Sequence, residues 1–318
     1  MQKIKYGVIG TGHMGTYHVN VASNLNEIDF IGVYDIDQAK SGRTATQFNT
    51  TNYNTAEDLL KECDAVSIAV PTTLHYEIGK LAIKHQTHIL LEKPICNIVS
   101  QAEELISLAE KQNIILEVGH VERFNGAVQE LLTIINKPLL WESRRLGPNT
   151  GRIHDVGVVM DLMIHDIDIC LRVINDKVKN INAYGRNIIS NCEDLASASL
   201  EFENGCIATL TTSRVTQEKI RTLSISQPDS YLYLDFTTQD LQIHKQATSK
   251  ISTSTEKIHY KQAALIERLF IHKENPLKSE ILNFITNIKN NQNSVDTNKT
   301  DLETLKITST ILEQITRT

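Results

Sequence analysis

A glycine-rich turn near the N-terminus constrains the fold of this 318-residue chain more than any other feature. The segment GVIGTGHMGTYH, residues 7–18, places Gly10, Gly12 and Gly15 in the spacing G-x-G-x-x-G, directly after an apolar run. In a strand–turn–helix unit the first glycine permits a tight turn, the second lets a pyrophosphate approach the backbone, and the third lets helix and strand pack closely. The turn therefore predicts a dinucleotide-binding domain, whereas the same glycines in another context would indicate only a loop.

Short apolar runs alternate with helical patterns through the first third of the chain. This alternation predicts an α/β fold with a doubly wound parallel sheet, a Rossmann domain. We expect strands at Lys5–Ile9, Phe30–Tyr34, Ala65–Val70, His88–Leu91 and Ile114–Val118, with helices near 13–25, 37–48, 55–61, 74–85 and 100–112.

The pattern changes after about residue 122 and predicts an α+β domain with a large open, mostly antiparallel sheet. Asn204-Gly205 is the best hairpin signal of the chain, and residues 246–259 indicate an exposed loop or a weak edge. We expect helices over Arg123–Asn136, 157–175, Pro276 to Asn290 and Asp301–Thr316, and strands at Ala196–Phe202, Ile207–Ser213, Leu223–Ser226, Tyr231–Phe236 and Leu241–His244.

The composition excludes several classes of protein. A net charge of -6 gives no general attraction to nucleic acid or to an anionic membrane. The five cysteines are scattered without a C-x-x-C pair, which predicts neither a disulfide framework nor a metal site. The N-terminus shows no signal peptide, and no apolar run reaches the roughly 18 residues that a membrane span needs, so we expect a cytoplasmic protein.

Asp35 identifies the expected cofactor. It ends the second expected strand, about 20 residues after Gly15, where a carboxylate accepts hydrogen bonds from the ribose hydroxyls of an adenosine. A 2′-phosphate would meet this negative charge, so NAD is favoured over NADP. We interpret Lys40 and Arg43, which follow on the next helix, as a solvated helix face.

Two apolar segments contain polar side chains that are candidate catalytic residues. Lys93 directly follows a strand, and the carboxyl ends of parallel strands are where ligands bind. In MDLMIHDID, residues 160–168, Asp161 and His165 are four apart and would share one face of a helix. The alternative interpretation is a buried pair whose members bond only each other.

Taken in order, the motifs resemble those of the Gfo/Idh/MocA oxidoreductases over essentially the whole chain. They are the glycine turn, AVPTTLH (69–75), EKP (92–94), VGHVERFN (118–125) and D-x-x-x-H (161–165). The resemblance implies catalytic roles for Lys93, Asp161 and His165. It implies cofactor contacts at Gly10, Gly12, His13, Met14, Gly15, Asp35, Thr72, His75, Glu92 and Lys93, and we also expect substrate contacts at Arg123, Arg152 and Asp155.

The resemblance further implies a sugar or cyclitol carbinol as substrate. Moving hydride from such a carbinol to NAD leaves a proton, and His is a natural acceptor because its ordinary pKa is about 6.5. Lys93 can stabilise charge on the same oxygen, and Asp161 can orient His165. Whether Lys93 or His165 takes the proton stays open.

Residues 144–168 and 213–225 resemble a subgroup of that family, the UDP-N-acetylglucosamine 3-dehydrogenases, whose 3-keto product is converted to an amino sugar for lipid A. The expected substrate is therefore a UDP-sugar oxidised at C3. A diphosphate would suit the nearby cations, although salt-bridged strand edges are the alternative interpretation of each. These cations are Arg144, Arg145, Arg152, Arg214, Lys219 and Arg221.

Other functions on the same fold remain open. They are a dehydrogenase or reductase of a free sugar or inositol, an NAD-dependent glycosidase that oxidises C3 transiently, and a non-catalytic NAD-binding regulator. We expect an NAD-binding domain at 1–122 and a substrate-binding and oligomerisation domain at 123–318, whose C-terminal helix can pack back on the first domain. The resemblance implies a homodimer or homotetramer. Gly126 stands where the family often has Pro, which predicts a looser start to that helix.

Overall fold

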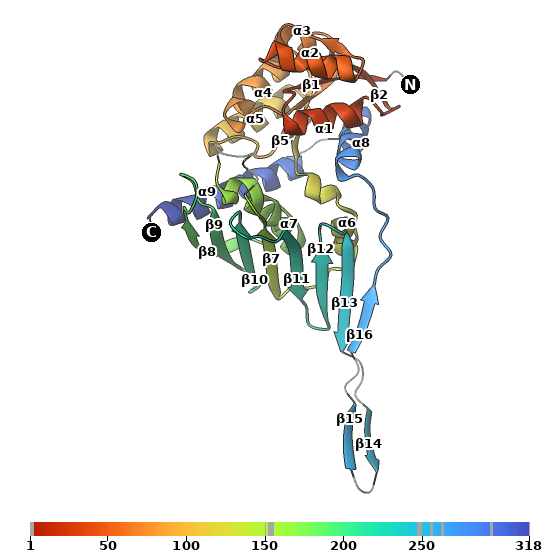
Figure 1. Cartoon of the computed structure of the whole chain (residues 1–318), viewed down its shortest axis with the longest axis vertical. Helices are drawn as coiled ribbons and strands as arrows, with labels where there is room; N and C mark the ends of the chain where they lie inside the picture. The colour runs from red at the N-terminus through yellow and green to blue at the C-terminus, as the bar shows by residue number, and fades with distance from the viewer. Residues whose placement is uncertain are drawn as a thin grey trace. The chain divides into compact units, whose positions relative to one another are not determined.

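In the computed structural model the chain folds into two compact units (Figure 1). The first unit comprises Met1–Phe124 and Glu274–Lys306, and the second comprises Asn125–Lys273 and Ile307–Thr318. The structure describes residues 3–149, 151, 156–246, 250–254, 257–261, 264–292 and 295–317.

A six-stranded parallel sheet forms the centre of the first unit. Its strand order is β3-β2-β1-β4-β5-β6, the order of a dinucleotide-binding doubly wound fold. The strands are apolar because helices bury both faces of the sheet. This confirms the predicted Rossmann fold. The strands are β1 (Ile4–Ile9), β2 (Ile28–Tyr34), β3 (Thr51–Asn52), β4 (Ala65–Ile68), β5 (His88–Glu92) and β6 (Leu116–Gly119).

Two pairs of helices cover this sheet. On one face α1 packs against α8, and the rings of Tyr6 in β1 and Phe284 in α8 meet edge to face with centroids 6.5 Å apart. On the other face α4 packs against α5. The helices of this unit are α1 (His13–Ala22), α2 (Gln38–Gln47), α3 (Ala56–Leu60), the 3-10 turn η1 (Thr72–Leu74), α4 (His75–Lys84), α5 (Val99–Lys111), the 3-10 turn η2 (Val121–Phe124) and α8 (Pro276–Lys289).

An eight-stranded sheet dominates the second unit. Its order is β16-β13-β12-β11-β7-β10-β9-β8. Among the described strands of this sheet only the β7–β10 pair is parallel, which confirms a mostly antiparallel sheet. The strands are β7 (Leu140–Leu146), β8 (Val178–Arg186), β9 (Leu195–Phe202), β10 (Ile207–Ser213), β11 (Ile220–Ser226), β12 (Ser230–Asp235), β13 (Asp240–Gln246) and β16 (Ala264–Arg268).

Helices cover one face of this second sheet. They are α6 (Gly126–Ile134), the π-helix η3 (Val159–Met163), α7 (Ile164–Ile174) and the end of α9 (Val295–Arg317). Their buried apolar residues form a single core with the sheet, in which Trp141 of β7 is the largest side chain. No helix in the part of the chain described above is long and apolar enough to cross a membrane.

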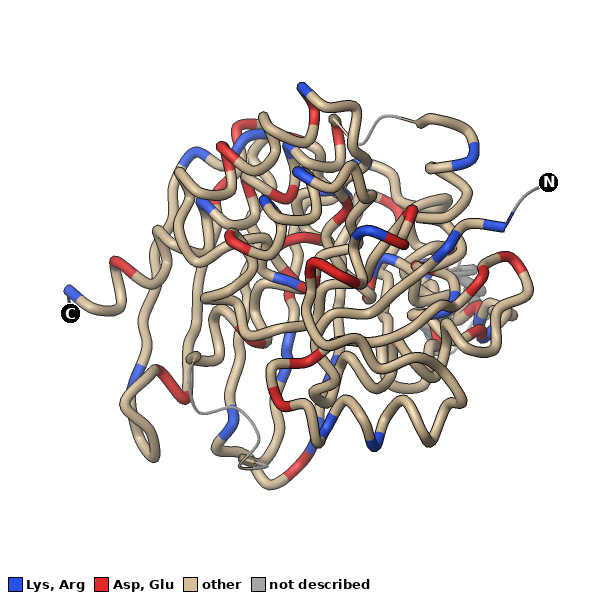
Figure 2. The backbone as a smooth tube through the Cα atoms, turned by 90° about the horizontal axis from the view of Figure 1, so that it is seen from above, with Lys and Arg blue, Asp and Glu red and all other residues tan. Residues whose placement is uncertain are grey.

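Charged residues of both signs are interspersed along the backbone rather than gathered into one stripe of described positions (Figure 2).

The structure differs from the predicted elements in several places. The helix expected over Arg123–Asn136 is broken at Asn125, which has an extended backbone and caps α6 through a bond from the Ala127 N–H to Oδ1 at 3.1 Å. Strands β3, β7, β8 and β16 were not predicted, and the sequences of β7 and β8 are rich in polar residues. The loop or weak edge expected at 246–259 contains the hairpin strands β14 (Lys250–Ser254) and β15 (Lys257–Lys261).

Gly126 explains why this chain departs from the usual Pro. Its N–H donates to Oε1 of Gln239 at 3.2 Å, a bond that Pro cannot make. A Cβ at this position would lie 2.7 Å from the carbonyl oxygen of His272. The start of α6 is therefore closely packed and capped, not loose as predicted.

We predict that Gly126→Ala destabilises the second unit by about 1–3 kcal/mol, because the added methyl must push a backbone carbonyl aside. Denaturant unfolding measures this loss. Gly147→Ala is the matched control, since no described atom lies within 4 Å of its added Cβ and its stability should change by less than about 0.5 kcal/mol. Equal effects of the two substitutions would contradict the steric explanation.

Candidate active site

The glycine turn is closely packed on its inner side and open at Gly12. Gly10 has a φ of +92°, and a Cβ there would lie 2.5 Å from the Ala69 carbonyl oxygen. A Cβ on Gly15 would lie 1.8 Å from the Gly10 carbonyl oxygen, so α1 approaches β1 only because both positions are glycine. At Gly12 the nearest atom to an added Cβ is Nζ of Lys40, at 3.9 Å.

The N-terminus of α1 follows this open position. Gly12 is its N-cap residue and supplies no side-chain hydrogen bond, and the first turn contains no acidic residue. The first N–H groups of a helix have no partner within the helix and bind anions readily. His13 is exposed and Met14 is half-buried beside this end. The turn therefore fits the pyrophosphate of a dinucleotide.

Asp35 lies directly after β2, next to the glycine turn. Its Oδ2 accepts bonds from the N–H and Oγ1 of Thr11 at 2.6 and 3.0 Å, and its Oδ1 accepts from the Asp37 N–H at 3.0 Å. Burial opposes ionisation, but these hydrogen bonds outweigh it and hold the pKa of Asp35 below its ordinary value. The group is therefore a fixed carboxylate beside the turn.

Thr72 and His75 lie where the chain leaves β4. Thr72 begins η1 and is half-buried, whereas His75 begins α4 and is 1% exposed. The two ring nitrogens of His75 lie 2.8 Å from the Pro94 carbonyl oxygen and 3.0 Å from that of Val70. Burial lowers the pKa of this imidazole. His75 thus contacts main-chain carbonyls on both sides.

Lys93 follows the last residue of β5 and is half-buried at the carboxyl edge of the sheet. The preceding Glu92 is buried, and its Oε1 lies 2.9 Å from Nε2 of His18 in α1. Sequence reasoning did not identify His18. Its place three residues after the last glycine of the turn, on the same helix, is the only signal that could have drawn attention to it.

The polar residues of the run 160–168 fall into two groups. Asp166 and Asp168 are each 1% exposed, and they pair with Arg145 at 2.8 Å and with Arg172 at 3.7 Å. Asp161 and His165 are only half-buried. Asp166 and Asp168 are therefore paired core residues, whereas Asp161 and His165 keep partial exposure to solvent.

Asp161 lies in the π-helix η3, not in a regular α-helix. The π-helix is rare and occurs mostly as a single turn, frequently at functional sites. Glu193 holds its start, since its main-chain oxygen accepts from the Val158 N–H at 2.9 Å and its Oε1 accepts from the Val159 N–H at 3.0 Å.

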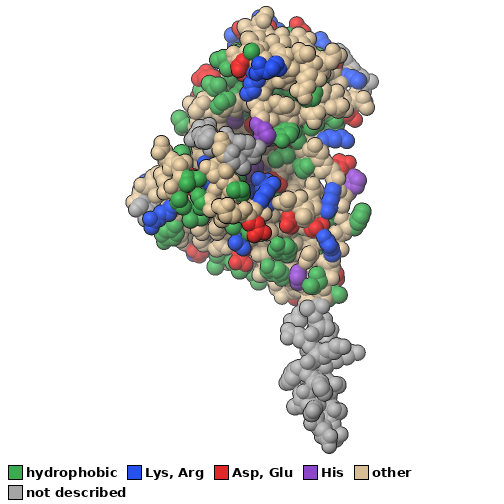
Figure 3. Space-filling model, in the orientation of Figure 1, with side chains coloured by type: hydrophobic (Ala, Val, Ile, Leu, Met, Phe, Trp, Pro, Cys, Tyr) green, Lys and Arg blue, Asp and Glu red, His purple; other side chains and the backbone are tan. Residues whose placement is uncertain are grey.

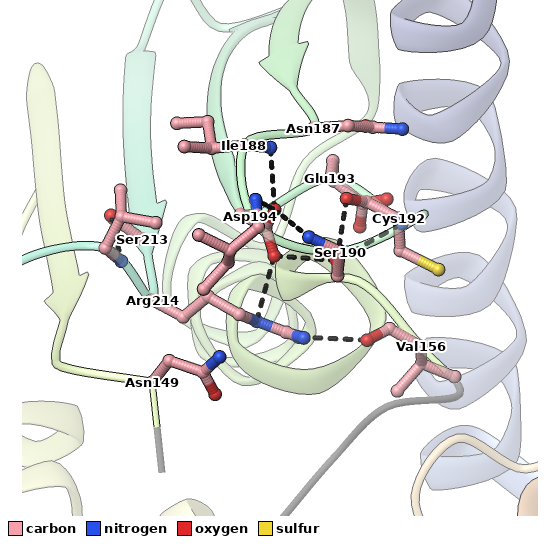
Figure 4. Close-up of polar contacts among 12 residues, drawn as sticks. Asn149, Val156, Asn187, Ile188, Ser190, Cys192, Glu193, Asp194, Ser213 and Arg214 are labelled. Atoms are coloured by element: carbon pink, nitrogen blue, oxygen red, sulfur yellow. Dashed lines mark hydrogen bonds and ion pairs between the residues drawn. The ribbon is translucent and has the colours of Figure 1, made fainter. Parts of the chain in front are cut away.

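A second buried acid supports the same segment (Figure 4). Asp194 accepts three main-chain N–H bonds from residues 188–190, and these lower its pKa to about 2 against the effect of burial. Arg214 lies between Asp194, at 4.0 Å, and the Val156 carbonyl oxygen, at 2.9 Å. The side chains around the N-terminal end of η3 are thus fixed by one another.

This arrangement changes the interpretation of the cation cluster. Arg145 and Arg214 are buried and bound to acids of the same unit, so they form internal ion pairs rather than an open diphosphate site. Arg144 is exposed on β7. Arg152, with Asp155, lies outside the described residues. Arg123, another predicted substrate contact, is buried and paired with Asp301 in the first unit.

The fold and the glycine turn define the class of dinucleotide-binding Rossmann proteins, and comparison with known proteins places the chain within it. Residues 4–120 match the family described as "Oxidoreductase family, NAD-binding Rossmann fold", and residues 139–226 match the GFO/IDH/MocA C-terminal domain. The chain therefore belongs to the Gfo/Idh/MocA family, as its motifs predicted. It is an oxidoreductase that uses a nicotinamide cofactor.

Two relatives illustrate the range of this family. UDP-N-acetylglucosamine 3-dehydrogenase of Acidithiobacillus ferrooxidans is 31% identical over 252 residues, 79% of this chain and 80% of that protein. Its solved structure matches with a TM-score of 0.90 at 28% identity, over 99% of this chain and 98% of that one. Myo-inositol 2-dehydrogenase of Thermotoga maritima is 25% identical over 232 residues, 66% of this chain and 69% of that protein.

Glu280 of α8 is a buried acid near the end of β5 that sequence reasoning also missed. It is 1% exposed, and neither carboxyl oxygen has a hydrogen-bond partner among the residues that the structure describes. Burial, and then the nearby Glu92 and Glu117, raise its pKa well above the ordinary value of 4.5. The folded protein therefore keeps this proton at pH values where the unfolded chain has lost it.

We predict that Glu280→Gln raises the free energy of unfolding more at pH 8 than at pH 5. Because the folded state binds the extra proton, stability falls as pH rises above about 4.5, by about 1.4 kcal/mol for each pH unit up to the folded-state pKa. Because Gln does not ionise, the variant should lack this loss of stability with rising pH. Denaturant unfolding at pH 5 and pH 8 measures the two free energies of unfolding, with Glu110→Gln on the exposed side of α5 as control. An unchanged pH dependence in Glu280→Gln would contradict the assigned pKa shift.

Proposed function

We propose that this protein is an NAD-dependent dehydrogenase that removes hydride from C3 of UDP-N-acetylglucosamine and forms a 3-keto sugar nucleotide. The product would serve amino-sugar synthesis for lipid A. The observation that carries this substrate is the 31% identity to the Acidithiobacillus ferrooxidans enzyme over 79% of the chain. The half-buried Lys93, Asp161 and His165 are the residues of this chain that would act on the sugar.

The cofactor is proposed to lie along the carboxyl edge of the parallel sheet. The open Gly12 and the N-terminus of α1 would hold its pyrophosphate, and Asp35 would accept hydrogen bonds from the adenosine ribose hydroxyls. Bound there, the nicotinamide supplies the hydride acceptor. Thr72 and Glu92 belong to the same edge of the sheet and would border it.

Three side chains would handle the proton and the oxygen of the reacting carbinol. Lys93 would donate a hydrogen bond to the oxygen as negative charge develops on it. His165 would accept the hydroxyl proton, and Asp161 would orient its ring. Lys93 belongs to the first unit and the other two to the second, so their joint action is part of the proposal.

NAD is the proposed cofactor rather than NADP. The fixed Asp35 carboxylate would repel a 2′-phosphate on the adenosine ribose. Lys40 points the other way, because its Nζ lies close to Gly12 and could attract a phosphate.

A second substrate class has one specific observation in its favour. The ion pairs of Arg145 and Arg214 take two cations away from the group expected to bind a diphosphate. A free sugar or an inositol needs no such cations, and the Thermotoga maritima relative is named for myo-inositol. A dehydrogenase of a free polyol is therefore the alternative.

We further propose a cytoplasmic homodimer or homotetramer, in line with the family resemblance. Among the described residues, helices pack on one face of the eight-stranded sheet, and the other face carries a mixture of hydrophobic, charged and uncharged side chains (Figure 3). Light scattering of the purified protein measures the mass, and a monomer at micromolar concentration would contradict this assignment.

The proposed reaction is tested by NADH absorbance after mixing the protein and NAD with UDP-N-acetylglucosamine, other UDP-sugars, free sugars and inositols, each with a ketone trap. We predict NADH with UDP-N-acetylglucosamine and at least a 100-fold lower rate in Lys93→Ala and His165→Ala, on the scale of general acid–base catalysis. NADH with only a free polyol would establish the alternative. Full activity in the Lys93→Ala, His165→Ala double variant would overturn the assignment of the site.

We predict that Asp35→Asn lowers the ratio of the NADP and NAD dissociation constants by about tenfold, which corresponds to about 1.4 kcal/mol. The amide keeps an oxygen for the Thr11 N–H but removes the charge that repels a 2′-phosphate. Titration with each cofactor measures the ratio. Asp29→Asn, an exposed acid on β2, the strand that precedes Asp35, is the control. An unchanged ratio in Asp35→Asn would place the adenosine ribose elsewhere.

A further inference from the structure

A chain of buried hydrogen bonds reaches the residue before Lys93. Tyr6 Oη lies 2.5 Å from Ser67 Oγ, Ser67 Oγ lies 2.8 Å from His18 Nδ1, and His18 Nε2 lies 2.9 Å from Glu92 Oε1. These residues come from β1, β4, α1 and β5, and none of the four is more than 9% exposed. The chain therefore joins the helix of the glycine turn to the end of β5 through the interior.

All three hydrogen bonds can form at once in a single direction when Glu92 is a carboxylate and His18 carries its one proton on Nε2. Glu92 then accepts from His18 Nε2, His18 Nδ1 accepts from the Ser67 hydroxyl, and Ser67 Oγ accepts from the Tyr6 phenol. Burial raises the pKa of that phenol. Tyr6 has no exposed surface and packs against Phe284. A chain that ends in the core in this way suits fixing a position better than releasing a proton to water.

A second histidine contacts the residue after Lys93. The His75 ring lies between the carbonyl oxygens of Pro94 and Val70, which follow β5 and β4. His75 belongs to α4, on the face of the sheet opposite α1 and α8. Side chains alternate between faces along a strand, and Leu90, two residues before Glu92, packs in the core cluster that contains Leu277 and Phe284 of α8. The two histidines thus approach the end of β5 from opposite faces.

We propose that His18 and His75 are positioning residues that hold the Glu92–Lys93–Pro94 segment from the two faces of the parallel sheet and so fix the place of the Lys93 amine. A lysine side chain is flexible, and effective catalysis requires its reacting atom to be held within about 0.5 Å. The contacts to the Glu92 side chain and to the Pro94 carbonyl oxygen would restrict the backbone on both sides of Lys93. The catalytic consequence rests on the proposed function, whereas the anchoring itself does not.

Hydrogen exchange followed by mass spectrometry tests the anchoring without substrate. His18→Phe and His75→Phe keep a ring but remove the hydrogen bonds. We expect the four amides of the segment 92–96, those of Glu92, Lys93, Ile95 and Cys96, to exchange at least tenfold faster. Peptides from β1 and from α5 should keep their rates. His18→Gln, whose amide can donate to Glu92 and accept from Ser67, should restore part of the protection. His85→Phe, at the far end of α4, is the matched control.

Two outcomes would overturn the proposal. Unchanged exchange at 92–96 would show that the histidines do not hold this segment. Equally faster exchange across the whole first unit would show that they serve only overall stability. Should His18→Phe fail to fold, Tyr6→Phe removes only the hydroxyl at the far end of the chain, and it should give a smaller increase confined to the same peptide.

A kinetic measurement separates this proposal from the proposed function. With a substrate that the natural protein oxidises, we expect kcat of His18→Phe and His75→Phe to fall about 10–100-fold, the cost of a misplaced catalytic group, while the NADH dissociation constant stays within about threefold. Unchanged kcat with faster exchange at 92–96 would contradict the positioning role. Faster local exchange in a protein that oxidises no substrate would support the anchoring and refute the proposed function alone.

Discussion

The close approach of α1 to the end of β1 is the constraint on which the rest of the first unit depends. It exists because Gly15 presents no side chain to the Gly10 carbonyl oxygen and because Gly10 adopts a positive φ. This contact leaves Gly12 open and directs the N-terminus of α1 to the carboxyl edge of the sheet. The strand order then brings the ends of β2 and β5, with Asp35 and Lys93, to that same edge.

The second unit shows how one helix separates structural acids from candidate catalytic groups. In the run 160–168 the acids that are fully buried, Asp166 and Asp168, have arginine partners. Taking a charge out of water is costly unless an opposite charge accompanies it, so these pairs belong to the core. Asp161 and His165 keep contact with solvent, and the π-helix turn of η3 sets Asp161 apart from the regular α7 that follows.

Local patterns predicted more of this protein than partnerships between distant residues did. The glycine turn, the alternating first third and Asp35 depend on neighbours in sequence, and the structure places them as expected. Strand β7 was not predicted because a charged residue such as Arg145 is typical of an exposed segment. In the structure Arg145 is buried, and Asp166, 21 residues later in the sequence, neutralises its charge. The same holds for His18, whose partners Ser67 and Glu92 lie 49 and 74 residues away. The break at Asn125 was not predicted because the amphipathic pattern continues through it, so the sequence does not distinguish this N-cap residue from a residue inside a helix.

The central claim is that hydride leaves a sugar carbon for the nicotinamide under the control of Lys93 and His165. The most direct measurement uses UDP-N-acetylglucosamine deuterated at C3, with mass spectrometry of the NADH formed. We predict that each NADH carries one deuterium and that the 3-keto sugar carries none at C3. NADH without deuterium, or deuterium found only in water, would show that the hydride does not come from C3 and would contradict the account.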